Sequence, residues 1–208
     1  AVAYGRKISV SQRNENPIVF YNTSEEDFEK IWKTYFDLER DYVSIVSRFS
    51  SDTHLKSASE NYYGIRVLNQ EPWEALCSFI ISQNNNIPRI KGIIKRLCEN
   101  FGEDLGDGFF AFPSAEKLKS LTPEDLSPLR AGFRAKYIID AAKKVSSGEI
   151  NFSEIVEKDI DFGRQTLRKI NGVGPKVAEC CLLYGLHNSF LLIRTALWTM
   201  KNTIWLKM

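Results

Sequence analysis

The sequence predicts a mainly α protein that carries a short antiparallel β segment near its start. Two β-rich runs, 6–10 and 17–21, flank the polar segment SQRNEN, a pattern typical of two strands joined by a loop. From Pro72 onward, apolar residues recur at helical spacing in one segment after another, with glycine- or proline-containing loops between them. Two strands do not form a stable sheet alone, so we expect 1–22 to be the remnant of a larger β domain.

The helical region is expected to span 23–208. Its first helix should begin at Thr23 or Ser24, because a hydroxyl residue before an acidic run is a common helix N-cap. The segment 103–114 predicts a loop rich in glycine, phenylalanine and proline, and the sequence has no internal repeat. Further helices are expected at about 40–49, 72–83, 87–102, 114–121, 123–129, 134–147, 153–157, 162–169 and 175–186.

The most informative motif is LRKINGVGPKVAEC at 167–180, which predicts a helix-hairpin-helix over about 162–186. The hairpin is Gly172-Val173-Gly174. Glycine reaches positive φ at little cost, and such a turn, with the following helix N-terminus, can present backbone N–H groups to a phosphate. This arrangement grips a DNA backbone without reading bases. An ordinary turn between two helices explains the Gly-x-Gly pattern equally well.

Composition permits a nucleic-acid-binding protein without requiring one. A chain of 208 residues with 43% hydrophobic residues can bury a core. Its formal charge of +2 is nearly neutral, so binding to nucleic acid would have to depend on local basic patches. Four scattered cysteines and two histidines form no metal-binding pattern, so we expect no metal or cofactor. The sequence shows no secretory leader and no apolar run of membrane-spanning length, which predicts an intracellular protein with reduced thiols and no membrane contact.

Three segments occur in the order and spacing of the 8-oxoguanine DNA glycosylases, which are members of the helix-hairpin-helix (HhH-GPD) superfamily. They are CSFIISQNNNIPRIKGIIKRLCENFG, AGFRAKYI and INGVGPKVAECCLL, and the resemblance covers most of 20–190. It implies the helix-hairpin-helix glycosylase fold, α+β overall. It further implies a monomer, in the nucleus of a eukaryote or the cytoplasm of a prokaryote, that excises 8-oxoguanine opposite cytosine from double-stranded DNA and cuts the abasic strand. Two alternatives stay open: a catalytically inactive DNA-binding module, and a structural helical domain with a chance hairpin.

The same resemblance implies roles at the DNA. A base flipped out of the duplex leaves a gap that a side chain must fill. Asn84 matches the residue that enters this gap, and Phe133 matches an aromatic wedge beside it. Arg89 and Arg134 match the residues that hydrogen-bond the estranged cytosine, a task suited to guanidinium donors. Without the resemblance, a polar helix-breaking loop at 84–86, core packing of the phenylalanine and a solvated basic face would explain these residues.

Lys176 matches the nucleophile, whose amine attacks the sugar C1′ and forms a Schiff base from which β-elimination cuts the strand. An unperturbed lysine, with a pKa of about 10.4, is mostly protonated at neutral pH, so the amine needs desolvation or cationic neighbours. Cys180 lies one helical turn later and matches a cysteine that stacks on the flipped base. A small buried apolar side chain explains this cysteine at least equally well.

The sequence departs from the family after the hairpin. The family carries Pro-Val-Asp, whose carboxylate assists the lysine, whereas this chain reads FLLIR at 190–194 and places Arg194 at the aspartate position. Ala196 stands where a phosphate-contacting histidine is often found. A cation beside an oxocarbenium-like sugar is repulsive, so we expect impaired excision. Codons for Phe-Pro-Val-Asp-Thr read one base later encode Phe-Leu-Leu-Ile-Arg, which predicts that 191–208 is a frameshifted tail and that later helices are missing.

Overall fold

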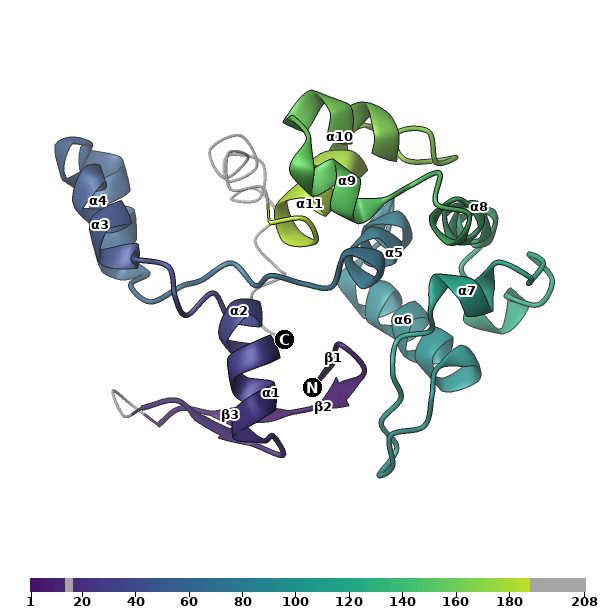
Figure 1. Ribbon diagram of the computed structural model, residues 1–208, viewed down its shortest axis with the longest axis horizontal. Helices are drawn as coiled ribbons and strands as arrows, with labels where there is room; N and C mark the ends of the chain where they lie inside the picture. Colours follow the sequence, from purple (N-terminus) through teal and green to yellow (C-terminus); the bar gives the residue numbers. More distant parts are fainter. Residues whose placement is uncertain (14–16, 188–208) are drawn as a thin grey trace. The chain divides into compact units, whose positions relative to one another are not determined.

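The computed structural model describes residues 1–13 and 17–187. They form helices together with two small two-stranded antiparallel sheets (Figure 1), which confirms the predicted mainly α, α+β class. The expected tail at 191–208, with Arg194 and Ala196, lies outside the described residues.

The chain divides into two compact units. The smaller unit is Thr23–Asn69, and the larger unit combines Ala1–Asn22 with Gln70–Met208. All the predicted site residues that the structure describes belong to the larger unit.

The β segment contains the predicted pair of strands, in shortened form. β3 (Ser9–Ser11) pairs antiparallel with β4 (Val19–Tyr21), so the expected pairing is confirmed. The first predicted strand is divided, because its start forms β2 (Arg6–Lys7), which pairs instead with β1 (Val2–Ala3). Two consecutive residues at positive φ, Tyr4 and Gly5, close that tight hairpin. A two-residue strand carries no periodicity, which is why the sequence did not predict β1.

In the smaller unit, Ser24 is the N-cap of the first helix, as expected: its hydroxyl accepts from the N–H of Asp27 at 3.1 Å. The helix runs through α1 (Glu25–Asp27), the π-helical η1 (Phe28–Trp32) and α2 (Lys33–Tyr35).

The helix expected at about 40–49 is α3 (Tyr42–Ser47), which continues into the 3₁₀ helix η2 (Arg48–Ser51). It is followed by α4 (Thr53–Asn61), which the sequence did not predict. The residues of α4, THLKSASEN, are mostly polar and give little apolar periodicity. An N-cap signal was nevertheless present, because the Asp52 side chain accepts from the N–H groups of His54 and Leu55.

The larger unit contains most of the predicted helices. They are α5 (Pro72–Ser82), α6 (Ile87–Phe101), α7 (Ala115–Leu118), α8 (Arg134–Ser146), α9 (Phe152–Glu157), α10 (Ile160–Leu167) and α11 (Pro175–Tyr184). The prediction of a helix at 123–129 is wrong. Of these residues, only the last three are helical, and they form the 3₁₀ helix η3 (Ser127–Leu129). Thr122 and Asp125 instead form a local turn in which each side chain accepts from the backbone N–H of the other.

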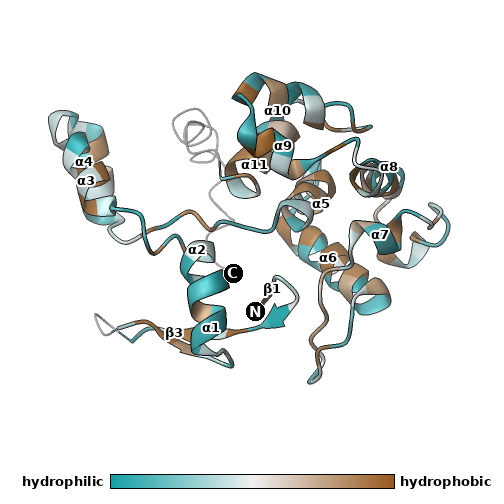
Figure 2. Ribbon diagram, viewed as in Figure 1, coloured by the Kyte–Doolittle hydropathy of each residue, from teal (hydrophilic) through white to brown (hydrophobic). Residues whose placement is uncertain are grey.

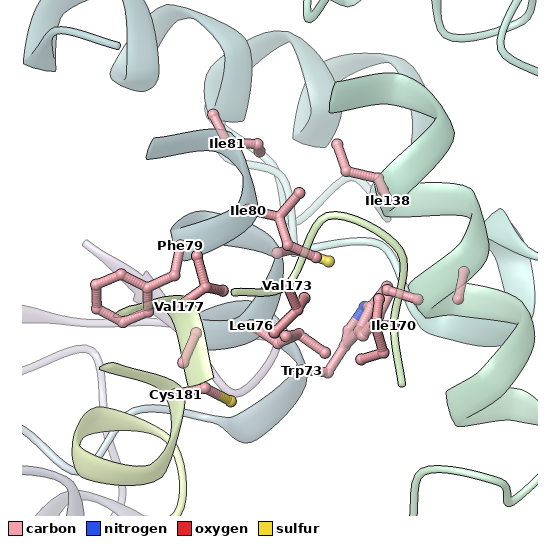
Figure 3. Close-up of a cluster of buried hydrophobic side chains, with 14 of the residues drawn as sticks. Trp73, Leu76, Phe79, Ile80, Ile81, Ile138, Ile170, Val173, Val177 and Cys181 are labelled. Carbon is pink, nitrogen blue, oxygen red and sulfur yellow. The ribbon is translucent and has the colours of Figure 1, made fainter. Parts of the chain in front are cut away.

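α5 forms the core of the larger unit and packs against α6, α8 and α11. Hydrophobic residues run along α5 and α11 (Figure 2). Ile170 and Val173, from the hairpin, lie beside Trp73 and Leu76 of α5 (Figure 3), and all four side chains are buried. Burial of one such side chain contributes about 1.5–3 kcal/mol, so the hairpin is fixed to the central helix by apolar packing.

Candidate functional site

The predicted hairpin joins α10 to α11, and its two glycines have different conformations. Gly172 has φ +79°, and a Cβ there would lie 2.4–2.6 Å from ring carbons of Tyr137. Gly174 has φ −88° and open space around it, so the expectation that both glycines serve positive φ is wrong for Gly174. Its neighbour Val173 is buried and donates its N–H to the carbonyl of Ile170 at 3.0 Å. The turn therefore requires glycine at 172 for close approach and leaves open space around position 174 at the helix start.

Helix α8 fixes the hairpin from the side. Asp140 Oδ2 accepts from the N–H of Asn171 at 2.7 Å and from Lys144 Nζ at 3.0 Å. Lys144 Nζ also donates to the carbonyl of Lys169 at 2.6 Å. These three contacts tie the backbone before the turn to one face of α8, so they hold the hairpin against this helix.

The turn leaves backbone donors open at the start of α11. Within 1–13 and 17–187, the N–H groups of Gly172 and Gly174 have no acceptor. The next residue, Pro175, carries no N–H and occupies the first position of the helix. Two donors next to a helix N-terminus can bind one anionic oxygen group, as the sequence predicted for a phosphate.

Lys176 is the second residue of α11, and its side chain is exposed. Cys180 is 4% exposed, and burial raises the pKa of its thiol to about 11, opposed by the positive charge of Lys176. The thiol is therefore neutral at physiological pH. This electrostatic interaction places the amine and the thiol close together along α11, as their spacing of four residues predicts.

Two carboxylates near the hairpin are already engaged in ion pairs. Glu179 accepts two hydrogen bonds from Arg164, from Nε to Oε1 at 2.5 Å and from Nη2 to Oε2 at 3.4 Å. Arg164 also pairs with Asp161 at 2.7 Å, while Asp140 pairs with Lys144 and caps the hairpin backbone. Both carboxylates thus stabilise the helix-hairpin-helix itself.

The asparagine triplet forms the turn between α5 and α6. The Asn85 amide donates to the carbonyl of Ile81 at 3.0 Å, and Asn86 caps α6 by accepting from the N–H of Arg89 at 3.0 Å. The helix-breaking interpretation therefore describes these two residues correctly. Asn84 differs from them: it is exposed, it has φ +43°, and its side chain makes no hydrogen bond within the described part of the chain.

Arg134 lies under this turn and is 2% exposed. Its Nε donates to the carbonyl of Gln83 at 2.9 Å, and Nη2 donates both to that oxygen and to the carbonyl of Asn84, the latter at 2.9 Å. Nη1 donates to the carbonyl of Ala131 at 3.2 Å. In this structure the guanidinium that was expected to contact a base is bound to backbone carbonyls.

Phe133 is the residue before α8 and is 49% exposed, which argues against core packing. Its ring packs edge-to-face on Tyr137, with centroids 5.8 Å apart, and lies 4.4 Å from the guanidinium carbon of Arg134. Arg89 is exposed, and its Nη2 approaches the carbonyl of Arg130 at 3.4 Å. Desolvation, and then the charge of Arg89, lower the pKa of Arg134, so the two guanidinium groups are close.

The sequence reasoning missed the supporting face of α8. Phe133, Tyr137, Asp140 and Lys144 follow one another at spacings of four, three and four residues, so they share one side of the helix. The first two form an aromatic pair, and the last three contact the hairpin. Their periodicity was visible in the sequence, but it gave no sign of what this face contacts.

Within 1–13 and 17–187, His, Cys, Asp and Glu side chains form no group of three or more that could hold a metal ion. In the same part of the chain, no helix combines the length and apolar character needed to cross a bilayer.

Two family models match consecutive parts of this chain, which together span 1–190. Residues 1–76 match the model described as the N-terminal domain of 8-oxoguanine DNA glycosylase. Residues 77–190 match the model described as HhH-GPD superfamily base excision DNA repair protein.

Individual proteins are also similar to the chain. The N-glycosylase/DNA lyase of Saccharomyces cerevisiae is 43% identical over 139 residues, which are 60% of this chain and 37% of that protein. The N-glycosylase/DNA lyase OGG1 of Arabidopsis thaliana is 30% identical over 205 residues, or 92% of this chain and 56% of that protein. The chain thus spans between about a third and somewhat over half of these curated relatives.

A solved structure extends the similarity over the whole chain. It is the Clostridium acetobutylicum 8-oxoguanine glycosylase/lyase in complex with double-stranded DNA containing cytosine opposite 8-oxoguanine, with 36% identity and a TM-score of 0.85. The match covers 100% of this chain and 73% of that one.

Proposed function

The chain belongs to the HhH-GPD superfamily of base excision DNA repair proteins, and from this premise we propose that it is an 8-oxoguanine DNA glycosylase with an associated lyase activity. The relatives named for these activities support the proposal. The observation that carries it is the start of α11, where two open backbone N–H groups precede the exposed amine of Lys176 within four residues. A phosphate-binding site beside a nucleophile is suited to attack on the sugar of a deoxynucleotide.

Double-stranded DNA containing 8-oxoguanine opposite cytosine is the proposed partner. The N–H groups of Gly172 and Gly174 bind one phosphate of the damaged strand, without reading its bases. The protein acts as a monomer where the genome is found, in the nucleus of a eukaryote or the cytoplasm of a prokaryote.

A second set of residues meets the base opposite the lesion. Asn84 projects from a left-handed turn and enters the gap left by the flipped base, and Phe133 wedges beside it. Arg89 and Arg134 complete this set. The exposure of the first two side chains supports these roles, since unstacking a base costs a few kcal/mol that inserted groups must offset.

In the proposed reaction, the neutral amine of Lys176 donates its electron pair to C1′ of the damaged nucleotide. The bond from C1′ to the base breaks, and its electrons leave on the base, which takes up a proton. Ring opening and loss of the amine proton give an imine between Nζ and C1′. Removal of a C2′ proton then expels the 3′-phosphate and cuts the strand. Cys180, neutral and buried beside the lysine, lines the base pocket.

The residue at the aspartate position makes excision slow in this chain. A guanidinium at Arg194 repels the positive charge that develops on the sugar, whereas an aldehyde already present at an abasic site forms the imine without expelling a base. We further propose that 191–208 arises from a changed reading frame, which the nucleotide sequence around codon 190 decides. An in-frame sequence that encodes these residues in closely related genes would contradict that origin.

Borohydride trapping tests the function. The 208-residue chain is incubated with duplexes that carry an abasic site or 8-oxoguanine opposite cytosine, and with an undamaged duplex. We expect a covalent adduct with the abasic duplex, little or no excision of 8-oxoguanine, and loss of the adduct in Lys176→Gln. An adduct that survives this substitution would remove Lys176 from the mechanism.

Binding to the undamaged duplex separates the remaining outcomes. Affinity that falls with salt, but without any adduct, would describe a DNA-binding module that has lost the chemistry. Absence of duplex binding altogether would refute the proposed function. Robust excision of 8-oxoguanine would show that another carboxylate replaces the aspartate.

A further inference from the structure

We propose that Asp140 is a positioning residue, whose carboxylate holds the hairpin so that the N–H of Gly172 can bind a DNA phosphate. A negatively charged side chain thereby strengthens the binding of a polyanion. The DNA readout of this role rests on the proposed function, while its structural part concerns the free protein.

A single oxygen of Asp140 binds the hairpin region in two ways. Oδ2 accepts from the N–H of Asn171 at 2.7 Å and from Lys144 Nζ at 3.0 Å. Lys144 Nζ in turn donates to the carbonyl of Lys169 at 2.6 Å. One ion pair on α8 therefore holds two backbone groups that precede the turn. Hydrogen bonds in which one partner is charged are roughly twice as strong as those between neutral groups.

This ion pair is largely withdrawn from solvent. The side chains of Asp140 and Lys144 are 22% and 19% exposed. Partial burial reduces the screening that makes exposed ion pairs weak, so the pair is better held than one on the open surface. The neighbouring ammonium also offsets the repulsion between this carboxylate and a phosphate at the hairpin.

The position of Asn171 determines where the N–H of Gly172 points. The carbonyl of Asn171 and the N–H of Gly172 belong to one planar peptide unit, so a fixed Asn171 limits the directions open to that N–H. The ring of Tyr137 lies directly against the exposed Gly172, since a Cβ there would be 2.4–2.6 Å from its carbons. After the turn, the N–H of Val173 is bound to the carbonyl of Ile170. The open donor is therefore restrained on both sides along the chain.

A glycine turn gains more from such support than another turn would. Glycine has the largest backbone freedom of any residue, so an unsupported Gly172 would lose much of that freedom when it binds a phosphate. Contacts that order the turn in the free protein remove this entropic cost from the binding step. Loss of the Asp140 contacts should therefore weaken DNA binding, although it removes a negative charge.

Two substitutions distinguish positioning from simple electrostatics. The amide oxygen in Asp140→Asn can accept the same two hydrogen bonds as Oδ2, whereas Asp140→Ala accepts neither. Charge repulsion alone predicts that both variants bind DNA more tightly than wild type. On a duplex with 8-oxoguanine opposite cytosine, we expect Asp140→Asn to bind at least as tightly as wild type. Asp140→Ala should bind roughly tenfold more weakly, the size of one lost hydrogen bond to a charged group. Tighter binding by Asp140→Ala would overturn the proposal.

The salt dependence of the affinity is a readout that lower stability alone does not change. Each phosphate contact contributes about 0.9 to the slope of log affinity against log salt concentration. Asp140→Ala should reduce the slope by about this amount, and Asp140→Asn should keep it. Asp161→Ala is the matched control, because it removes a carboxylate of the same motif that pairs with Arg164 of its own helix. We expect an unchanged slope for the control; an unchanged slope for Asp140→Ala counts against the positioning role.

Borohydride trapping at a saturating concentration of abasic duplex separates positioning from chemistry. Asp140→Asn should form the adduct at the wild-type rate, because Lys176 supplies the amine and the hairpin keeps its support. Asp140→Ala should need a higher duplex concentration to reach the same yield. Loss of the adduct in Asp140→Asn, with duplex binding retained, would make Asp140 a catalytic residue and refute the assigned role.

Amide exchange of Asn171, measured by NMR on the free protein, tests the structural part without DNA. Asp140→Ala should accelerate this exchange relative to the amides of α6, and Asp140→Asn should leave it unchanged. Equal exchange in wild type and Asp140→Ala refutes the positioning role whatever the DNA results show. A wild-type chain that binds no duplex refutes the proposed function, while the exchange comparison still decides the structural part. Should Asp140→Ala not fold, Asp140→Ser replaces it, since the serine hydroxyl lies one bond closer to the backbone of α8.

Discussion

Replacing Gly172 with alanine should destabilise the protein through two separate effects. The residue has φ +79°, a conformation that costs an L-residue about 1–2 kcal/mol. The new Cβ would also lie 2.4–2.6 Å from three ring carbons of Tyr137, so that ring must move. Overpacking of this kind costs typically about 1–3 kcal/mol.

The two effects add to about 2–5 kcal/mol, a large part of the roughly 5–15 kcal/mol that stabilises a typical domain. For a chain of this size, each kcal/mol lowers the melting temperature by about 2–4 °C. We therefore expect Gly172→Ala to lower the melting temperature by about 4–20 °C. Urea unfolding followed by circular dichroism gives the free energy of unfolding directly.

Gly174→Ala is the matched control, because Gly174 has φ −88° and nothing within 4 Å of the added Cβ. Its free energy of unfolding should stay within about 1 kcal/mol of wild type. In a Tyr137→Ala background, which removes all three ring carbons that the new Cβ would meet, Gly172→Ala should cost only the conformational part. If Gly172→Ala and Gly174→Ala have equal stabilities, the argument from close approach is refuted.

Three further predictions concern binding, chemistry and pH. Gly174→Pro should weaken binding to damaged and undamaged duplexes alike, because it removes an open backbone N–H, while the φ of −88° at this position lies near the range of proline. Fluorescence anisotropy measures the affinity. A normal affinity would show that the hairpin does not bind the DNA backbone. Lys176→Gln should abolish borohydride trapping. Its melting temperature should stay within about 2 °C of wild type, because the side chain is exposed, and a large drop would indicate a structural role. Burial, and then the charge of Glu71, raise the pKa of Glu74 from 4.5 to about 7. Between these values the folded state holds a proton that the unfolded state has lost, so stability falls as pH rises from about 4.5 to 7. Glu74→Gln should reduce this fall and be more stable at pH 8 by at most about 3 kcal/mol, while Glu71, whose pKa burial also raises, keeps its own contribution. A wild-type stability that is flat over this range would contradict the assignment.

Local patterns in the sequence were sufficient for the parts of the fold that depend on nearest neighbours. The N-cap at Ser24, the apolar run of α5 and the amphipathic α6 were all predicted, because caps and helical periodicity act over a few residues. The same reasoning failed at 123–129, where the side chains of Thr122 and Asp125 compete with the helix for backbone groups.

At the candidate site, the sequence by itself determined the helix-hairpin-helix, the lysine in the first turn of α11 and the family to which these motifs are similar. The tertiary structure alone decided what the surrounding residues do. It showed that position 172, unlike position 174, has no room for a side chain, because Tyr137 of another helix lies against Gly172. It likewise showed that Arg134 donates to carbonyls some fifty residues earlier in the chain. Contacts between distant segments arise from how helices pack, and neither propensity nor periodicity carries that information.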